Sequence, residues 1–273
     1  MKAETNRTVA IIGCGNLGGC LARLLVSSGI CDKSTLTLVE HSESRRSALH
    51  AELGIPATSE LPATLKASVI LICVKPQDFS ALAPVLRALL RPDQIVVSMM
   101  AGIPIQKLTA ELNQHGKIVR TMPNLGSRIG ASATVVKFGC NLPKAELQHV
   151  KQIIESLGTA LSVEDERLID AATAFSGSGP GFIYYALEKL IEIGTSLGFS
   201  PAEAETLTQQ TFFGSLKLWI DSQLPLSELR AQVTSKQGTT AAGIAVFERE
   251  KLAAILREGI EAARRRAEEL GRL

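Results

Sequence analysis

The most informative stretch of this 273-residue chain is Thr8-Val-Ala-Ile-Ile-Gly-Cys-Gly-Asn-Leu-Gly18. Its first five residues are β-branched or apolar without alternation, which predicts a strand buried on both faces. Glycines 13, 15 and 18 follow in a G-x-G-x-x-G spacing, and residues 16–28 have the length and pattern of a helix. A strand, a glycine-rich turn and a helix in this order predict the first unit of a dinucleotide-binding fold.

Each glycine of this turn has a separate mechanical role. We expect Gly13 to permit the tight turn, Gly15 to let a ligand approach the backbone, and Gly18 to let helix and strand pack closely. Backbone N–H groups at the positive end of the helix dipole would then hold a pyrophosphate. The cofactor-binding residues predicted from the turn are Gly13, Gly15, Asn16, Leu17 and Gly18. For the motif alone, a glycine-rich turn without a ligand is the alternative.

Strand-like and helix-like segments continue to alternate up to about residue 163. Further strand candidates are residues 35–39, 69–74, 95–99, 117–121 and 132–137, and further helix candidates are residues 44–53 and 144–157. Repeated βαβ units predict an α/β fold with a Rossmann-like, doubly wound sheet in residues 1–163.

Beyond residue 163 the strand pattern ends, and residues 164–273 predict an all-helical domain. Breaks are expected at residues 177–181, 198–201 and 224–225. So short a chain has little capacity for a core of its own. We therefore expect its apolar helices, residues 182–193 and 207–220, to pack on a second subunit as a dimerisation domain.

Charge and composition exclude several classes of protein. With 29 Lys and Arg against 27 Asp and Glu, the chain has no basic field for nucleic acid, and 4% aromatic residues give no stacking platform. No run approaches the roughly 18 apolar residues of a membrane span. The five cysteines form no CxxC pair, so neither a metal site nor a disulfide framework is expected. Residues 1–8 lack a leader pattern, which predicts a cytoplasmic protein.

The predicted second strand ends at Glu40, where a dinucleotide-binding fold reads the adenosine ribose. A carboxylate there can accept hydrogen bonds from both ribose hydroxyls and would repel a 2′-phosphate. Ser42, Arg45 and Arg46 could instead bind that phosphate. The cofactor is therefore NADH or NADPH, and Glu40 favours NADH.

Histidine is missing where a dehydrogenase that oxidises an alcohol would need its base. The four histidines all precede residue 150, and none lies in an obvious active-site loop. The glycine-rich segments at residues 175–181 and 233–243 carry hydroxyl groups instead, which suit a carboxylate and a nitrogen. An imine fits this set, because as a protonated iminium it needs little help from a general acid. Helix capping is the alternative role for these segments.

The order of these motifs resembles the pyrroline-5-carboxylate reductase family over nearly the whole chain. The motifs that carry the resemblance are Gly13–Gly18, Val74-Lys-Pro76, Ala101-Gly102, Arg120-Thr-Met-Pro-Asn124, Ser176-Gly-Ser-Gly-Pro180 and residues 233–248. The resemblance implies NAD(P)H-dependent reduction of 1-pyrroline-5-carboxylate to L-proline, by hydride transfer to the C=N carbon. It also implies a homodimer through the intertwined helical domain, often assembled into larger rings.

The resemblance also implies roles for individual residues. Lys75 and Ala101 would line the cofactor, with Met122 and Asn124 on the nicotinamide side and Ser176 beside the substrate. The substrate carboxylate would lie among Ser235, Gly238, Thr239 and Thr240. The Thr240 hydroxyl would act as the catalytic group by donating to the ring nitrogen.

This chain departs from the family pattern in two loops. Lys236-Gln237 replaces a Pro-Gly pair, and Leu125-Gly126 followed by Arg128 replaces the usual Thr-Pro. These changes leave open a paralogue that reduces another cyclic imino acid, such as a piperideine carboxylate. A cofactor-binding protein without turnover is a further alternative. So is a hydroxyacid dehydrogenase, for which Lys189 on the first long C-terminal helix would be the catalytic lysine.

Overall fold

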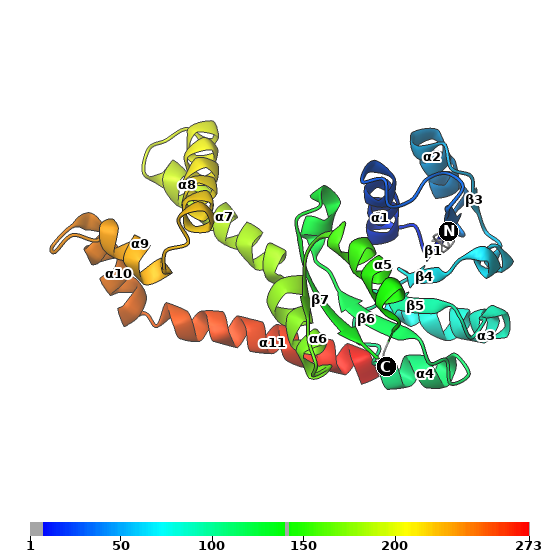
Figure 1. Cartoon of the computed structure of the whole chain (residues 1–273). Helices are drawn as coiled ribbons and strands as arrows, with labels where there is room; N and C mark the ends of the chain where they lie inside the picture. The colour runs from blue at the N-terminus through cyan, green and yellow to red at the C-terminus, as the bar shows by residue number, and fades with distance from the viewer. Residues whose placement is uncertain (1–7, 140–141, 273) are drawn as a thin grey trace. The chain divides into compact units, whose positions relative to one another are not determined.

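Figure 1 shows the computed structural model of the chain, which describes residues 8–139 and 142–272. Residues 1–7, on which the absence of a leader pattern rests, and Cys140 lie outside the described residues. The chain divides into two compact units, one of residues 1–179 with 263–273 and the other of residues 180–262. The sequence-based boundary near residue 163 stays a prediction.

An eight-stranded sheet forms the centre of the first unit (Figure 1). In spatial order the strands are β3 (Ala57–Thr58), β2 (Leu36–Val39), β1 (Val9–Ile12), β4 (Val69–Ile72), β5 (Ile95–Ser98), β6 (Ile118–Met122), β7 (Ser132–Phe138) and β8 (Gly158–Ser162). The first six run parallel, whereas β7 is antiparallel to β6 and β8 runs parallel to β7. The predicted doubly wound sheet is confirmed. Its order reverses between β1 and β4, the switch point at which such sheets bind ligands.

Helices cover both faces of this sheet. They are α1 (Asn16–Ser27), α2 (Glu43–Leu53), α3 (Phe79–Leu89), α4 (Ile105–Glu111) and α5 (Lys144–Glu155). Because strand side chains alternate, Ile11 packs into a core with α1 and α5, whereas Ile12 packs into a second core with α3 and α4. Burial on both faces explains why the central strands are continuously apolar.

Shorter elements complete the first unit, and the last of them leads to the second unit. The 3-10 turns are η1 (Leu61–Lys66), η2 (Pro76–Asp78) and η3 (Leu125–Ile129), and helix α6 (Arg167–Ala172) continues into the π-helical turn η4 (Thr173–Gly177). The predicted strand at residues 69–74 is too long. It ends at Ile72, because Cys73 and Val74 turn to pack against the glycine-rich turn.

The second unit is helical, as predicted. It contains α7 (Gly179–Ser196), α8 (Pro201–Ser222), α9 (Leu226–Gln232), α10 (Thr239–Arg249) and the first half of α11 (Leu252–Arg272). Helix α8 begins with a capping box, in which the backbone N–H of Ser200 donates to the Glu203 carboxylate at 2.8 Å. No helix in residues 8–139 and 142–272 is long and apolar enough to cross a membrane.

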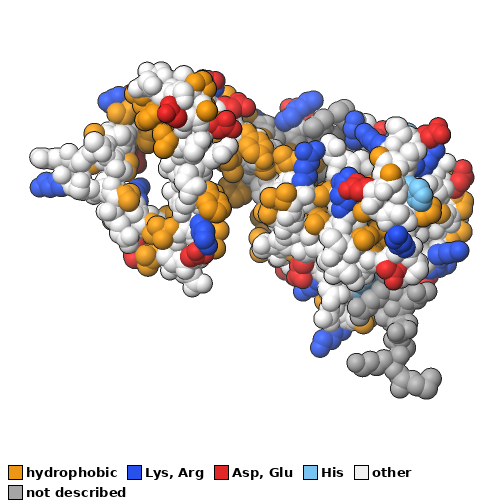
Figure 2. Space-filling view, turned by 90° about the horizontal axis from the view of Figure 1, so that it is seen from above, with side chains coloured by type: hydrophobic (Ala, Val, Ile, Leu, Met, Phe, Trp, Pro, Cys, Tyr) orange, Lys and Arg blue, Asp and Glu red, His pale blue; other side chains and the backbone are white. Residues whose placement is uncertain are grey.

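The second unit has almost no core of its own. Of residues 180–262, all of which the structure describes, only Ala204 is buried. Large hydrophobic side chains such as Tyr185, Phe213 and Ile220 are more than half exposed, and Figure 2 shows such side chains in orange on this unit. Exposed apolar surface on this scale is typical of an interaction surface.

Candidate active site

The glycine-rich turn joins β1 to α1 at the switch point of the sheet. Gly13 adopts φ +87°, and a Cβ there would lie 2.8 Å from Val74 Cγ1. A Cβ on Gly18 would overlap the Gly13 carbonyl oxygen and lie 3.1 Å from Cys73 Cβ. Gly15 is the N-cap of α1, whose first N–H groups have no partner inside the helix. The turn therefore presents open backbone N–H groups, which fit a pyrophosphate.

Glu40 holds this turn against the loop that follows β2. The backbone N–H of Cys14 donates to Glu40 Oε2 at 2.9 Å, and that of Ser42 donates to Oε1 at 2.9 Å. His41 Nδ1 lies 3.0 Å from the same Oε1. The Glu40 side chain is only 2% exposed. A carboxylate has about four acceptor sites, so these contacts leave one on Oε2 for a ribose hydroxyl.

The two arginines of the β2–α2 loop have different roles. Arg46 Nη1 donates to the carbonyl oxygens of Glu40, at 2.9 Å, and His41, at 2.6 Å, so it supports the loop backbone. Arg45 is exposed, and its Nη1 lies 3.5 Å from the place that a Cβ on Gly15 would occupy. Arg45 therefore lies beside the glycine-rich turn, where its positive charge would attract a phosphate.

Two thiols lie behind the turn. Burial, followed by the negative charge of Glu40, raises the pKa of Cys14 to about 12. Burial also raises the pKa of Cys73 far above its ordinary value. Both groups stay protonated at neutral pH and serve as small packing residues, because only a thiolate would be nucleophilic.

A second group of predicted residues meets where β6 ends. Asn124 Nδ2 donates to the backbone oxygen of Ser176 at 3.1 Å, while Asn124 Oδ1 accepts from the Gly126 N–H at 3.0 Å and caps η3. Met122 packs so closely against Gly177 that a Cβ there would lie 2.8 Å from Met122 Cε. Met122, Asn124 and Ser176 are thus together, and the Ser176 hydroxyl donates to the carbonyl oxygen of Ala172 at 3.2 Å.

A cavity of about 630 Å³ opens at the carboxyl edge of the sheet in the first unit. Its walls include Pro76, Ala101, Gly102, Lys107, Thr173 and Ser178. Ala101 was predicted to line the cofactor, and Lys75, which was too, directly precedes Pro76 as the N-cap of η2. Thr173 is not among the residues predicted from the sequence. It lies two residues before the hydroxyl-rich segment 175–181, and extending that segment toward the N-terminus would have included it.

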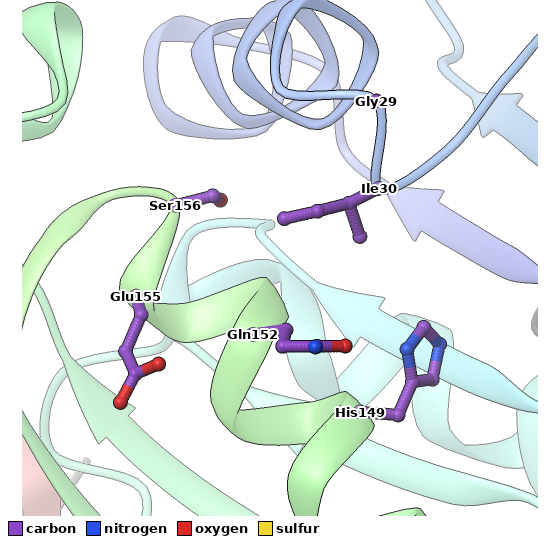
Figure 3. Close-up of a pocket in the computed structure, with 6 residues that line it drawn as sticks. All are labelled: Gly29, Ile30, His149, Gln152, Glu155 and Ser156. Atoms are coloured by element: carbon purple, nitrogen blue, oxygen red, sulfur yellow. The ribbon is translucent and has the colours of Figure 1, made fainter.

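Another pocket, shown in Figure 3, lies away from the glycine-rich turn. It is lined by Gly29 and Ile30, which follow the C-terminal end of α1, and by residues of α5 and its end: His149, Gln152, Glu155 and Ser156. The glycine-rich turn lies at the opposite, N-terminal end of α1. This pocket is therefore no part of the candidate active site.

The predicted carboxylate loop lies in the second unit, between α9 and α10. The Gly238 N–H donates to the Ser235 carbonyl oxygen at 3.0 Å, and a Cβ on Gly238 would overlap Ser235 Oγ. Thr239 and Thr240 form the first turn of α10, whose N–H groups have no acceptor inside the helix. Within residues 8–139 and 142–272, the exposed Thr240 hydroxyl has no hydrogen-bond partner. It is thus available to a ligand.

The departures from the family pattern alter this loop. Gln237 adopts φ +64°, a left-handed conformation that glycine tolerates far better than a residue with a side chain. Lys236 and Gln237 are both exposed. The loop therefore keeps the backbone shape that glycine favours and adds two long polar side chains beside Ser235.

Lys189 makes surface contacts on α7. Its Nζ lies 2.6 Å from Glu192 Oε1 and 5.6 Å from the centre of the Tyr185 ring. An exposed lysine paired in this way does not favour the hydroxyacid dehydrogenase alternative. In the part of the chain that the structure describes, no cluster of three or more His, Cys, Asp or Glu residues could hold a metal ion.

The doubly wound sheet, its switch point and the glycine-rich turn define a dinucleotide-binding oxidoreductase. Residues 8–102 match the family model described as NADP oxidoreductase, coenzyme F420-dependent, and residues 166–270 match pyrroline-5-carboxylate reductase dimerisation. Pyrroline-5-carboxylate reductase from Pseudomonas aeruginosa is 33% identical over 263 residues, which cover 96% of each chain. The chain therefore belongs to the pyrroline-5-carboxylate reductase family.

Solved structures agree with this membership. A pyrroline-5-carboxylate reductase from Coxiella burnetii is 28% identical and superposes with a TM-score of 0.90, covering 97% of this chain and 99% of its own. Pyrroline carboxylate reductase from Plasmodium falciparum, solved with NADP bound, is 25% identical with a TM-score of 0.86 and covers 97% and 98%. The cofactor is thus of the NAD(P) class, and the helical second unit is part of an oligomerisation domain.

Proposed function

We propose that this protein reduces 1-pyrroline-5-carboxylate to L-proline with NAD(P)H. The observation that carries the proposal is the likeness to pyrroline-5-carboxylate reductases over 96% of the chain. The cavity lined by Ala101, Thr173 and Ser178 and the free hydroxyl of Thr240 support it. The experiment that tests it is steady-state turnover of this imine, with L-proline identified as the product.

The residues present suit this chemistry. When bound, the nicotinamide supplies a hydride to the C=N carbon, and the ring nitrogen keeps the electron pair of the broken π bond. As that pair develops on the nitrogen, the Thr240 hydroxyl donates a hydrogen bond to it; before hydride transfer the iminium nitrogen has no lone pair to accept one. The N–H groups at the start of α10 and the Ser235 hydroxyl hold the substrate carboxylate. A protonated iminium needs no further proton during hydride transfer, so positioning provides most of the rate.

We also propose that the active unit is a homodimer formed through the second unit, with the Thr240 loop acting on a cofactor held by the partner subunit. Support comes from the exposed hydrophobic side chains of α7 and α8, which need a covering surface. Assembly of dimers into larger rings and a cytoplasmic location stay predictions from the sequence.

The finer cofactor preference is proposed to be NADH, because the buried Glu40 carboxylate directly follows β2, where a dinucleotide-binding fold reads the adenosine ribose. We expect Glu40→Ser to raise the ratio of kcat/KM for NADPH to that for NADH by about tenfold, the equivalent of about 1.4 kcal/mol. The ratio is the informative quantity, because loss of the Cys14 contact with Glu40 would loosen the turn and weaken the binding of NADH and NADPH to the same extent. Glu43→Ser, a change on the first turn of α2, is the matched control. A strong NADPH preference in the wild-type protein would contradict the NADH proposal.

A further inference from the structure

Arg120 on β6 is a wholly buried arginine, with 1% of its side chain exposed. Its strand neighbours Val119 and Thr121 are also buried, so the guanidinium lies inside the packed first unit. An arginine keeps its charge at any physiological pH, and a buried charge requires partners. Burial of Arg120 in β6 therefore requires acidic groups beside its guanidinium.

Two carboxylates supply them, one at the N-cap of the short helix α6 and one within it. Arg120 Nη1 donates to Glu166 Oε1 at 2.8 Å, and Nη2 donates to Asp170 Oδ1 at 2.5 Å. Glu166 Oε1 also accepts the backbone N–H of Ile105, the first residue of α4, at 2.8 Å. Arg120 thus joins β6 to α6 directly and to the beginning of α4 through Glu166.

These two connected elements lead into two parts of the lining of the cavity at the sheet edge. Ala101 and Gly102 lie just before α4 and line one wall, while Thr173 and Ser178 follow α6 and line another. The π-helical turn between those two hydroxyl residues also carries Ser176, which Asn124 of the β6 end holds through its backbone oxygen. Arg120 does not line the cavity, but its ion pairs hold the beginning of α4 and the helix α6, and the lining residues lie next to these two elements.

We propose that Arg120 is a positioning residue that fixes the separation of these two walls and thereby the place of the imine over the nicotinamide. The planar guanidinium presents its donors in a rigid fork, which can hold Glu166 and Asp170 at a set spacing. A lysine ammonium keeps the charge without that geometry. This inference rests on the proposed function, because the imine must occupy the cavity for the spacing to affect turnover.

Arg120→Lys in the full-length protein tests the proposal. We expect kcat/KM for 1-pyrroline-5-carboxylate to fall by about 100-fold, the cost of a displacement of roughly 1 Å at a reacting centre. The Kd for NADH, measured by fluorescence titration, should change far less than kcat/KM, because the glycine-rich turn makes no contact with this ion-pair network, which leads toward the cofactor only through the Ala101 wall. Arg23→Lys, which alters the exposed pair with Glu52, is the matched control and should leave both quantities unchanged.

Asp170→Asn provides a second variant in case Arg120→Lys does not fold. It keeps an acceptor oxygen of the same shape but removes one charge, so we expect a smaller loss of kcat/KM in the same direction. A lowered Tm with unchanged kcat, KM and NADH Kd in these variants would overturn the positioning role and leave a structural one. A wild-type protein that oxidises neither NADH nor NADPH in the presence of any cyclic imine tested would overturn the proposed function and this inference together.

Discussion

Replacing Gly18 with alanine is expected to weaken NADH binding by at least about 100-fold. The added Cβ would overlap the Gly13 carbonyl oxygen and press on Cys73, so α1 must move away from β1. Overpacking of this kind costs about 1–3 kcal/mol in stability, and the same displacement moves the N–H groups that face the pyrophosphate. Fluorescence titration with NADH measures the affinity, and thermal unfolding shows how far the fold is weakened.

Gly116→Ala is the control for this prediction. Gly116 lies in the same unit, with nothing within 4 Å of the place for its Cβ, so its substitution should leave both NADH affinity and Tm close to wild type. If the NADH affinity of Gly18→Ala stayed within about threefold of wild type, the close packing of α1 on β1 would not be needed to hold the pyrophosphate, which would contradict this account of the turn.

Replacing Thr240 with alanine has the second large expected effect. Loss of a hydrogen-bond donor to the reacting group costs about 100- to 1,000-fold in kcat in other enzymes, and a loss toward the lower end is expected here because the iminium already carries its proton. Cofactor affinity should not change, since Thr240 lies on α10 and the glycine-rich turn lies in the other unit. Steady-state kinetics with the imine and a separate NADH titration measure these two quantities.

Thr240→Ser should restore most of the rate, because it keeps the hydroxyl group and removes only a methyl group. Thr206→Ala removes a threonine hydroxyl whose partner is the Ala202 carbonyl oxygen within α8, and it should leave turnover unchanged. An unchanged rate in Thr240→Ala would remove Thr240 from the mechanism.

The sequence predicts most of the first unit because its signals are local. The strand before Gly13 and the helix from Asn16 were placed within one residue of their observed ends, since a continuous apolar run and a G-x-G-x-x-G spacing need only neighbouring residues. Strands β3 and β8 were missed. The first has two residues, and the second mixes glycine, hydroxyl and exposed apolar residues without a regular pattern. The antiparallel direction of β7 leaves no mark in its composition.

The candidate site was less predictable where it depends on distant contacts. Glu40 was expected to face a ribose, and the residue pattern could not show that the N–H groups of Cys14 and Ser42 already bind its carboxylate. The bond from Asn124 to Ser176 joins segments 52 residues apart. The Arg120 network joins three segments; the motif at residues 120–124 and a charge within a mostly apolar strand mark Arg120, but neither indicates its acidic partners.

The central claim is most directly tested by steady-state oxidation of NADH and NADPH with five- and six-membered cyclic imino acids in all four combinations. We predict the highest kcat/KM for 1-pyrroline-5-carboxylate with NADH, with L-proline as the product. Faster turnover of the six-membered piperideine carboxylate would identify a paralogue shaped by Lys236 and Gln237. Tight NADH binding without oxidation of either cofactor on either imine would contradict the claim that this protein is an imine reductase.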